Sequence, residues 1–183
     1  MDAAVRVFAR NGFHGSRVGD IAEEAGVAHG LLYHYFRSKD EVLETIFRET
    51  WSGLVAETER IEASGAPLRE QLHRFAGLYL GSWLVTPERI RVLVREVARS
   101  PEVGNRVEEI RELFVALQRM IETASARGEV RAGCDAQLVA WVVYGALEEI
   151  LTGWVLGQLP AEERDVERAV VTVVDVAYAG LAA

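Results

Sequence analysis

Cysteine, proline and lysine are scarce in this 183-residue chain, which has one cysteine, four prolines and a single lysine. The lone Cys134 excludes an intrachain disulfide and a paired-cysteine metal site. Few prolines, together with frequent Ala, Leu, Glu and Arg, favour helix throughout. Since half of the residues are apolar, a sizeable core is available. We therefore expect an all-α fold.

The chain also lacks the pattern of a signal peptide or a membrane span. Its first residues carry acid and base in an amphipathic pattern, without a small-residue cleavage site. The most apolar stretch, Leu138 to Leu156, is interrupted by Glu148 and Glu149. Two carboxylates there favour a buried helix of a soluble protein. We expect a cytoplasmic protein.

Positive charge is scarce overall, with 20 basic against 28 acidic residues and a net charge of −8. That balance argues against a generally basic DNA-binding protein, whose affinity comes from neutralising phosphates. Residues 25–39 differ because they contain no acid, while His29, His34, Arg37 and Lys39 lie among them. This acid-free window is the expected place for a DNA contact, although such a gap can also arise by chance.

Turn and capping residues divide the chain into nine predicted helices. Ser38 to Glu41 fits a capping box, while Pro67 and Pro87 stand where prolines begin helices. The first three helices are too short to be stable alone, so we expect an N-terminal DNA-binding domain over 1–47 and a body over 48–183. The predicted helices cover approximately residues 1–10, 18–25, 29–35, 38–62, 67–85, 86–99, 100–127, 135–156 and 161–181.

Residues 21–33 fit a helix-turn-helix, in which the second helix enters the major groove of DNA. Ala22 is small enough for a close helix crossing, Gly26 suits the left-handed turn, and Val27 is expected to fill the corner. Leu32 and Phe36 should point inward, which leaves the rest of the third helix for bases and phosphates. The predicted DNA-binding residues are Arg17, Ala28, His29, Gly30, Leu31, Tyr33, His34, Tyr35 and Lys39.

The pattern over residues 4–47 closely resembles the N-terminal signature of the tetracycline-repressor (TetR) family. It combines the glycine turn at Gly26, Tyr33-x-x-Phe36, and the Ser38-Lys39-Asp40 start of the fourth helix in fixed register. The resemblance implies nine helices, a homodimer, DNA contacts from the second, third and fourth helices, and a ligand pocket in the body.

Three departures from the family pattern affect the expected DNA contacts. Arg17 and Val18 stand where a threonine pair is common, and Ala28 replaces a frequent serine. The sequence also begins inside the first predicted helix, without the basic arm usual in the family. These differences bear on individual contacts more than on DNA binding itself.

Aromatic residues recur at helical spacing in the body, as in Phe75, Tyr79 and Trp83. Such stripes are more often core than ligand lining, but they would also suit an apolar cavity. Glu148 stands out as a polar residue in an apolar run. It could contact a ligand, form a salt bridge with Arg111, or pair across a dimer interface. The candidate ligand-binding residues are Trp51, Phe75, Tyr79, Trp83, Arg111, Phe114, Trp141, Tyr144 and Glu148.

Residues 144–156 and 127–131 resemble the branch of the same family that regulates fatty-acid degradation (FadR-like). That resemblance implies a long-chain acyl-coenzyme A (acyl-CoA) effector. The last two predicted helices, 135–157 and 161–181, are expected to form a homodimer. The apolar face for it would come from Val166, Ala169, Val170, Val173, Val174 and Ala177. Two recognition helices roughly 34 Å apart would then require a palindromic operator.

The sequence thus predicts a ligand-responsive regulator that is released from double-stranded DNA by a small apolar effector. The family resemblance implies that it is a repressor. An alternative is a TetR-type regulator of an efflux or other metabolic gene that responds to a different hydrophobic ligand. An enzyme is disfavoured because His14, His29, His34 and His73 form no catalytic or metal-binding motif. A helical interaction protein would require Tyr33 and Lys39 to be incidental. No catalytic residue, metal site or cofactor is expected.

Overall fold

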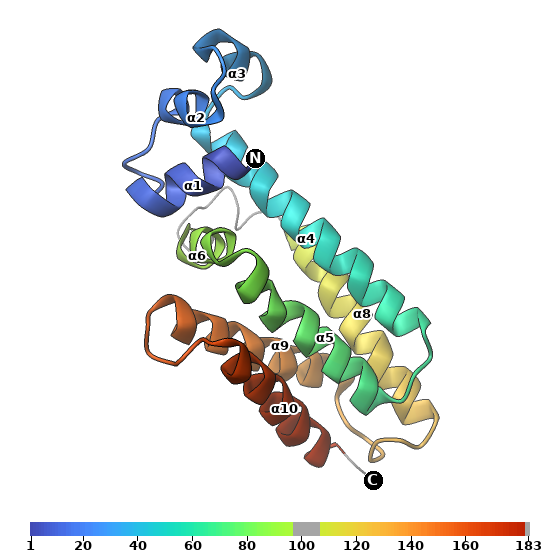
Figure 1. Cartoon of the computed structure of the whole chain (residues 1–183). Coiled ribbons are helices and arrows are strands. Elements are labelled where there is room, and N and C mark those ends of the chain that lie inside the picture. Colours follow the sequence, from blue (N-terminus) through green and yellow to red (C-terminus); the bar gives the residue numbers. More distant parts are fainter. Residues whose placement is uncertain (97–106, 182–183) are drawn as a thin grey trace. The chain divides into compact units, whose positions relative to one another are not determined.

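The computed structural model describes residues 1–96 and 107–181, which form an all-helical protein (Figure 1). The expected fold class is confirmed, and the second and third helices have the predicted bounds. The expected start of the seventh helix at Ser100-Pro101 lies outside the described residues. Those described form α1 (Asp2–Asn11), α2 (Val18–Ala25), α3 (His29–Tyr35), α4 (Lys39–Ala63), α5 (Leu68–Val85), α6 (Pro87–Glu96), α8 (Val107–Ala126), α9 (Ala136–Val155) and α10 (Glu163–Ala179).

The chain divides into two compact units. The head unit holds Met1–Trp51 and Thr86–Val107, and the body unit holds Ser52–Val85 and Glu108–Ala183. Helix α4 is continuous through the division, so its first half belongs to the head and its second half to the body. Assignment of function to 1–47 and 48–183 stays a prediction.

The head unit is built on α1, which packs against α2 and α6. Val7 and Phe8 of α1 are buried, and the Phe8 ring meets the Phe13 ring edge-on at 5.3 Å. From α4, Ile46 and Phe47 are buried in the same unit. These contacts fix α1 and α2, because an isolated short helix gains too little from its own hydrogen bonds.

The turn of the helix-turn-helix forms as expected around Gly26, which has φ 67° and ψ 29° and ends α2. Val27 N donates to Ala22 O at 3.0 Å, and Ala22 is fully buried. The left-handed conformation at Gly26 would be strained for a residue with a Cβ. The prediction that Val27 fills the corner is wrong, since the turn leaves 36% of this residue exposed.

The start of α4 is capped by a variant of the expected capping box. Glu41 N donates to Ser38 Oγ at 3.2 Å, as expected. The return bond comes from Arg37 N, one residue earlier than in the standard motif, and reaches Glu41 Oε2 at 2.7 Å. Both bonds satisfy backbone donors just before or within the first turn of the helix.

The body unit is organised around α5, which packs against α9 and α10. Its aromatic stripe is core, because Phe75, Tyr79 and Trp83 are all buried. Helix α9 is the one described helix long and apolar enough, by length and composition alone, to cross a membrane. Its Leu147 and Leu151 are buried inside the body, so packing accounts for part of its apolar character, while Leu138 and Val142 of the same helix are exposed.

The apolar face of α10 packs within its own chain. Val166, Val170 and Val174 are buried, and α10 lies against α5 and α9. Arg69 of α5 also pairs with Asp175 of α10 at 2.6 Å. The expectation that these valines form the dimer surface is therefore wrong, since an amphipathic pattern shows that a face is buried without showing by what.

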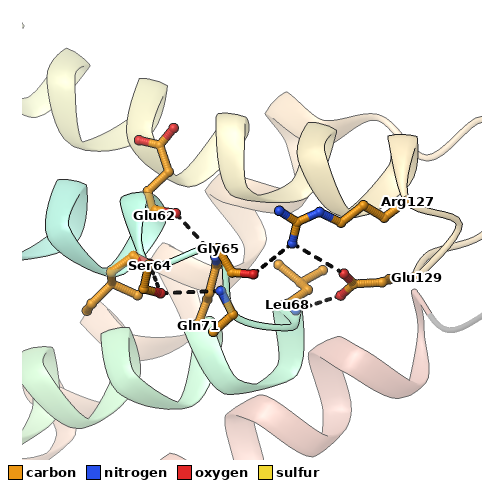
Figure 2. A network of polar contacts seen from close by, with 9 residues as sticks. Glu62, Ser64, Gly65, Leu68, Gln71, Arg127 and Glu129 are labelled. Atoms are coloured by element: carbon orange, nitrogen blue, oxygen red, sulfur yellow. Dashed lines mark hydrogen bonds and ion pairs between the residues drawn. The ribbon is translucent and has the colours of Figure 1, made fainter.

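A polar network holds the turn between α4 and α5 against the end of α8 (Figure 2). Arg127 donates to Gly65 O at 2.9 Å and lies 3.7 Å from Glu129. Glu129 Oε2 accepts from Leu68 N at 2.7 Å, at the start of α5. Since a helix start has free N–H groups and a positive dipole end, the carboxylate stabilises α5 there.

Helix α8 holds the end of α4 through a second contact. Arg119 donates to both carboxylate oxygens of Glu62, at 2.8 and 2.7 Å, and lies 3.9 Å from Glu59. Bidentate pairing of this kind fixes orientation as well as distance. Within the body unit, the last turn of α4 is therefore tied to α8.

Candidate DNA-binding surface and ligand site

Helix α3 presents an unusually open surface. All of its residues lie in the described part of the chain, and none is fully buried. Leu32 and Phe36 are half-buried, which agrees only in part with the prediction that they point inward. Tyr33 and Tyr35 are 54% and 66% exposed. Large apolar and aromatic side chains left in solvent on one short helix mark an interaction surface.

The chemistry of this surface is uncharged or weakly basic. Ala28 begins α3 without a side-chain cap, and His29, Gly30, Leu31 and His34 are all exposed. The surface offers imidazole and phenol donors, a close-approach glycine and an apolar contact, with no carboxylate to repel phosphate. The expected residues of α3 are thus brought together on one exposed element.

Arg17 lies at the other edge of the helix-turn-helix, as the N-cap of α2. Its backbone N donates to Asp20 Oδ2 at 2.8 Å, and its side chain is exposed. The start of α2 is therefore fixed by a local hydrogen bond, while the guanidinium is free to extend from it. This placement suits a contact to the DNA backbone.

Lys39 differs from the other predicted DNA-binding residues because its ammonium is bonded inside the head unit. It donates to the carbonyl oxygens of Phe13, His14 and Ser16 at 2.8, 3.1 and 3.2 Å. The same nitrogen lies 4.7 Å from the centre of the Phe13 ring. A phosphate contact from Lys39 would require these bonds to be exchanged.

The body unit contains a cluster of two phenols and a carboxylate. Tyr79 and Tyr144 both donate to Glu148 Oε2, the latter at 3.4 Å, and their hydroxyl oxygens lie 3.3 Å apart. Burial, followed by the nearby negative charge, raises the pKa of Tyr79 and of Tyr144 well above the ordinary range. Both phenols therefore remain hydrogen-bond donors at physiological pH.

Aromatic rings surround this cluster. Phe75 lies 6.0 Å from Tyr79, and Phe114 of α8 lies 5.0 Å from Tyr144. The Phe114 ring also stacks on Trp141 at 4.1 Å, although 55% of Trp141 remains exposed. Five of the predicted ligand-binding residues thus gather around Glu148, and they lead from the core to the surface.

The other predicted ligand-binding residues lie apart from the cluster. Trp83 packs on Trp154 with ring centres 6.0 Å apart and donates to Ala161 O at 3.2 Å, which explains it as core. Trp51 belongs to the head unit, where it packs on Phe47. Arg111 is exposed on α8. A ligand contact from these three residues stays a prediction.

Sequence reasoning missed two features of these sites. The first is Gly19, against which the His29 ring packs; a glycine inside a helical pattern is the signal that could have indicated close packing. The second is a small hollow of about 160 Å³ between α9 and α10, lined by Trp154, Leu159 and Arg168 among others. No local sequence pattern marks a hollow between two helices.

Two protein families match this chain. The family described as "Bacterial regulatory proteins, tetR family" matches residues 1–46, and that described as "YsiA-like protein, C-terminal region" matches residues 66–175. The "Fatty acid metabolism regulator protein" of Bacillus subtilis is 30% identical over 159 residues, which cover 85% of this chain and 81% of the relative. The chain belongs to the tetR family of bacterial transcriptional regulators. It is therefore a regulator and not an enzyme.

Solved structures agree with this assignment. The transcriptional regulator FadR from Bacillus subtilis, in complex with stearoyl-CoA, is similar at a TM-score of 0.84 and 26% identity, over 98% of this chain and 96% of that chain. FadR from Bacillus halodurans, also at a TM-score of 0.84 but 24% identical, covers the same shares and shows the fold. The resemblance to the fatty-acid-degradation branch is confirmed as a relationship.

The relationship extends to regulators with other names. The "HTH-type transcriptional repressor KstR2" of Mycolicibacterium smegmatis is 27% identical over 149 residues, which cover 76% of this chain and 69% of the relative. The ketosteroid regulator KstR2 of Mycobacterium tuberculosis shares the fold at a TM-score of 0.77 and 19% identity. Family membership by itself thus leaves the effector open.

Proposed function

We propose that this chain is a cytoplasmic transcriptional repressor that binds a palindromic operator as a homodimer and is released by a long-chain acyl-CoA. The observation that carries the DNA-binding part is the open, acid-free face of α3 within a tetR-family head. The proposed contacts are Arg17 at the start of α2 and Ala28, His29, Gly30, Leu31, Tyr33, His34 and Tyr35 on and beside α3.

The test is selection of bound duplexes from a random double-stranded library, followed by affinity measurements on the enriched sequence. We expect a palindrome, because a two-fold dimer presents two identical recognition helices. Tyr33→Phe should weaken binding roughly threefold to tenfold, the cost of one hydrogen bond. Tyr178→Phe, on α10 in the body, is the matched control. Enrichment of no sequence would contradict the proposal.

For the dimer, support comes from apolar residues that α9 and α10 leave in solvent. Leu138 and Val142 of α9 are 62% and 67% exposed, and Val176 of α10 is 72% exposed. These helices pack side by side in the body unit, so the three side chains lie on neighbouring elements. We propose that they, rather than the buried valines of α10, meet a second copy. Val142→Glu should produce a monomer in analytical ultracentrifugation.

The acyl-CoA effector is supported by the aromatic cluster and by similarity to FadR in complex with stearoyl-CoA. Phe75, Phe114 and Trp141 are large apolar groups that an acyl chain could contact, while Tyr79, Tyr144 and Glu148 supply a few polar atoms among them. A mainly apolar site with few convergent polar groups is typical of small-molecule binding.

The effector is tested by adding stearoyl-CoA to the complex with the selected duplex. We expect release by stearoyl-CoA and none by coenzyme A alone, with octanoyl-CoA and stearate as chain-length and headgroup controls. Glu148→Gln should change the concentration needed for release, whereas Glu149→Gln, its exposed neighbour, should not. Failure of stearoyl-CoA to bind would contradict this part. Native mass spectrometry of the purified protein then identifies any other hydrophobic ligand.

Release requires the effector to favour one of two states of the dimer. Helix α4 supplies residues to both the head and the body, and α8 carries both Phe114 of the aromatic cluster and Arg119, which holds Glu62 of α4. We propose that the effector changes the packing around Phe114 and that α8 passes this change to α4. Structures of the operator-bound and effector-bound dimers with the same head separation would contradict this mechanism.

A further inference from the structure

We propose that Lys39 is a positioning residue, which holds the loop between α1 and α2 in its DNA-binding conformation and does not itself contact phosphate. The inference rests on the proposed DNA-binding function. It assigns to Lys39 a role different from the phosphate contact that its position at the start of α4 suggests.

The ammonium group of Lys39 donates to three backbone carbonyl oxygens that surround it. Three backbone oxygens of one short loop, those of Phe13, His14 and Ser16, lie 2.8–3.2 Å from Lys39 Nζ. An ammonium group has three N–H donors, so this set matches its full hydrogen-bonding capacity. The Phe13 ring below the same nitrogen adds a cation–π contact.

The choice of lysine supports this role. Nineteen of the twenty basic residues are arginine, and Lys39 is the single exception. Arginine is the better residue for paired contacts to phosphate, since its planar guanidinium presents two parallel donors. A compact ammonium on a flexible stem suits three oxygens that converge on one point. The single lysine of the chain therefore stands where three carbonyl oxygens surround one nitrogen.

The loop that Lys39 holds leads directly to a proposed DNA contact. Its third carbonyl belongs to Ser16, a buried residue whose Oγ donates to Gly12 O at 2.6 Å. Arg17 follows immediately and is the N-cap of α2. Lys39 thus connects the start of α4 to the residue before Arg17. Loss of this connection would leave Arg17 and the first turn of α2 less well placed for DNA.

The hydrogen bonds from Lys39 to the three carbonyl oxygens are tested without DNA by nuclear magnetic resonance of the protein labelled with ¹⁵N-lysine. A single lysine gives a single side-chain ammonium signal, which is observed only when its protons exchange slowly with water. We expect that signal in the free protein and little change on binding the selected duplex. A signal that is absent from the free protein and appears only with DNA would overturn the proposal, whether or not an operator has been found.

The positioning role is tested by comparing Lys39→Arg with Lys39→Met. Dissociation constants for the selected duplex are measured well below the melting temperature, so that lost stability alone does not change them. We expect both variants to bind about tenfold or more weakly. The arginine in Lys39→Arg keeps the positive charge, but its planar guanidinium does not direct three N–H donors from a single nitrogen as an ammonium group does. Wild-type affinity in Lys39→Arg, with weak binding in Lys39→Met, would instead indicate a phosphate contact.

Two further variants separate this result from failure of the proposed function. Arg17→Gln should also weaken binding and serves as the positive control for the surface that Lys39 positions. Arg48→Gln removes a positive charge elsewhere on α4, where Arg48 pairs with Glu44, and should bind as the wild type does. If the wild-type protein binds no duplex, the proposed function fails, while the ammonium signal still tests the hydrogen bonds of Lys39.

Discussion

The imidazole of His29 lies directly against Gly19, so that α3 contacts the first turn of α2 through a ring and a missing side chain. A Cβ at Gly19 would lie 2.5 Å from His29 Cε1 and 3.2 Å from Nε2. These distances are too short for any side chain to be added without movement. The ring of His29, which we propose to contact DNA, is thus placed by the absence of a side chain on the neighbouring helix.

The first prediction is that Gly19→Ala moves His29 without unfolding the head. The clashing atoms belong to the end of a flexible side chain, which can rotate away. Alanine also favours helix over glycine by about 1 kcal/mol. We expect an unchanged or higher melting temperature together with DNA affinity as weak as that of His29→Ala.

The double variant Gly19→Ala/His29→Ala makes this prediction sharper. Since both changes act through the same ring, the double variant should bind DNA no more weakly than His29→Ala alone. Additive losses would show that Gly19 acts on DNA binding by another route. Gly30→Ala, where nothing lies within 4 Å of an added Cβ, is the matched glycine control for the melting temperature.

A second prediction concerns alkaline pH. Because the pKa of Tyr79 and of Tyr144 is raised in the folded state, chiefly by burial, the folded protein holds these protons more tightly than the unfolded chain does. Their contribution is fully present below the ordinary value of about 10 and is lost as pH rises towards the folded values. We expect the melting temperature to fall above about pH 10.

Absorbance of phenolate, followed during the same titration, identifies the residues responsible. Tyr79→Phe should reduce the alkaline loss of stability, because one buried phenol no longer has to ionise. Tyr35→Phe, which removes an exposed phenol, should not. An equal alkaline decline in wild type and Tyr79→Phe would disprove this account.

A third prediction is that the Arg119–Glu62 pair stabilises the body and that salt weakens it. The pair is partly exposed but bidentate, so a double-mutant cycle with Arg119→Gln and Glu62→Gln should give about 0.5–1 kcal/mol of coupling. The coupling should decrease in high salt. Arg74→Gln, which loses an ion pair within α5, should cost less.

A fourth prediction is that Glu129 stabilises α5 from outside that helix. Glu129→Ala removes the acceptor of Leu68 N and a negative charge at a helix start, so we expect a loss of about 1 kcal/mol in the free energy of unfolding. Glu129→Gln keeps an acceptor and should lose less. Denaturant unfolding at equilibrium measures both. Equal stability of Glu129→Ala and the wild type would show that water replaces the carboxylate at no cost.

Local features of the fold followed from the sequence. The bounds of α2 and α3 were predictable because Gly26 ends α2, and because Gly26 and Ser38, the capping residue of α4, leave only a short segment for α3. The aromatic stripe of α5 was recognisable from its four-residue spacing. Such features depend on residues a few positions apart, and their physical causes act within one or two turns.

Contacts between distant segments did not follow. Glu148 was expected to contact a ligand, to pair with Arg111 or to pair across a dimer interface, and its hydroxyl donors Tyr79, 69 residues away in sequence, and Tyr144 were not foreseen. Lys39 bonds to a loop more than 20 residues earlier. A sequence pattern shows that a charged group needs partners, whereas the fold decides which carbonyl or phenol is within reach.

The burial of the α10 valines within one chain bears on how operator occupancy depends on the amount of regulator in the cell. Since Val170 and Val174 are covered by their own chain, the burial of this apolar face does not need a second copy. In the proposed dimer, folding and pairing would then be separate equilibria, and only the second would depend on concentration. When dimers are few, their number rises with the square of the number of chains. Modest changes in expression would then change operator occupancy steeply, even without any effector.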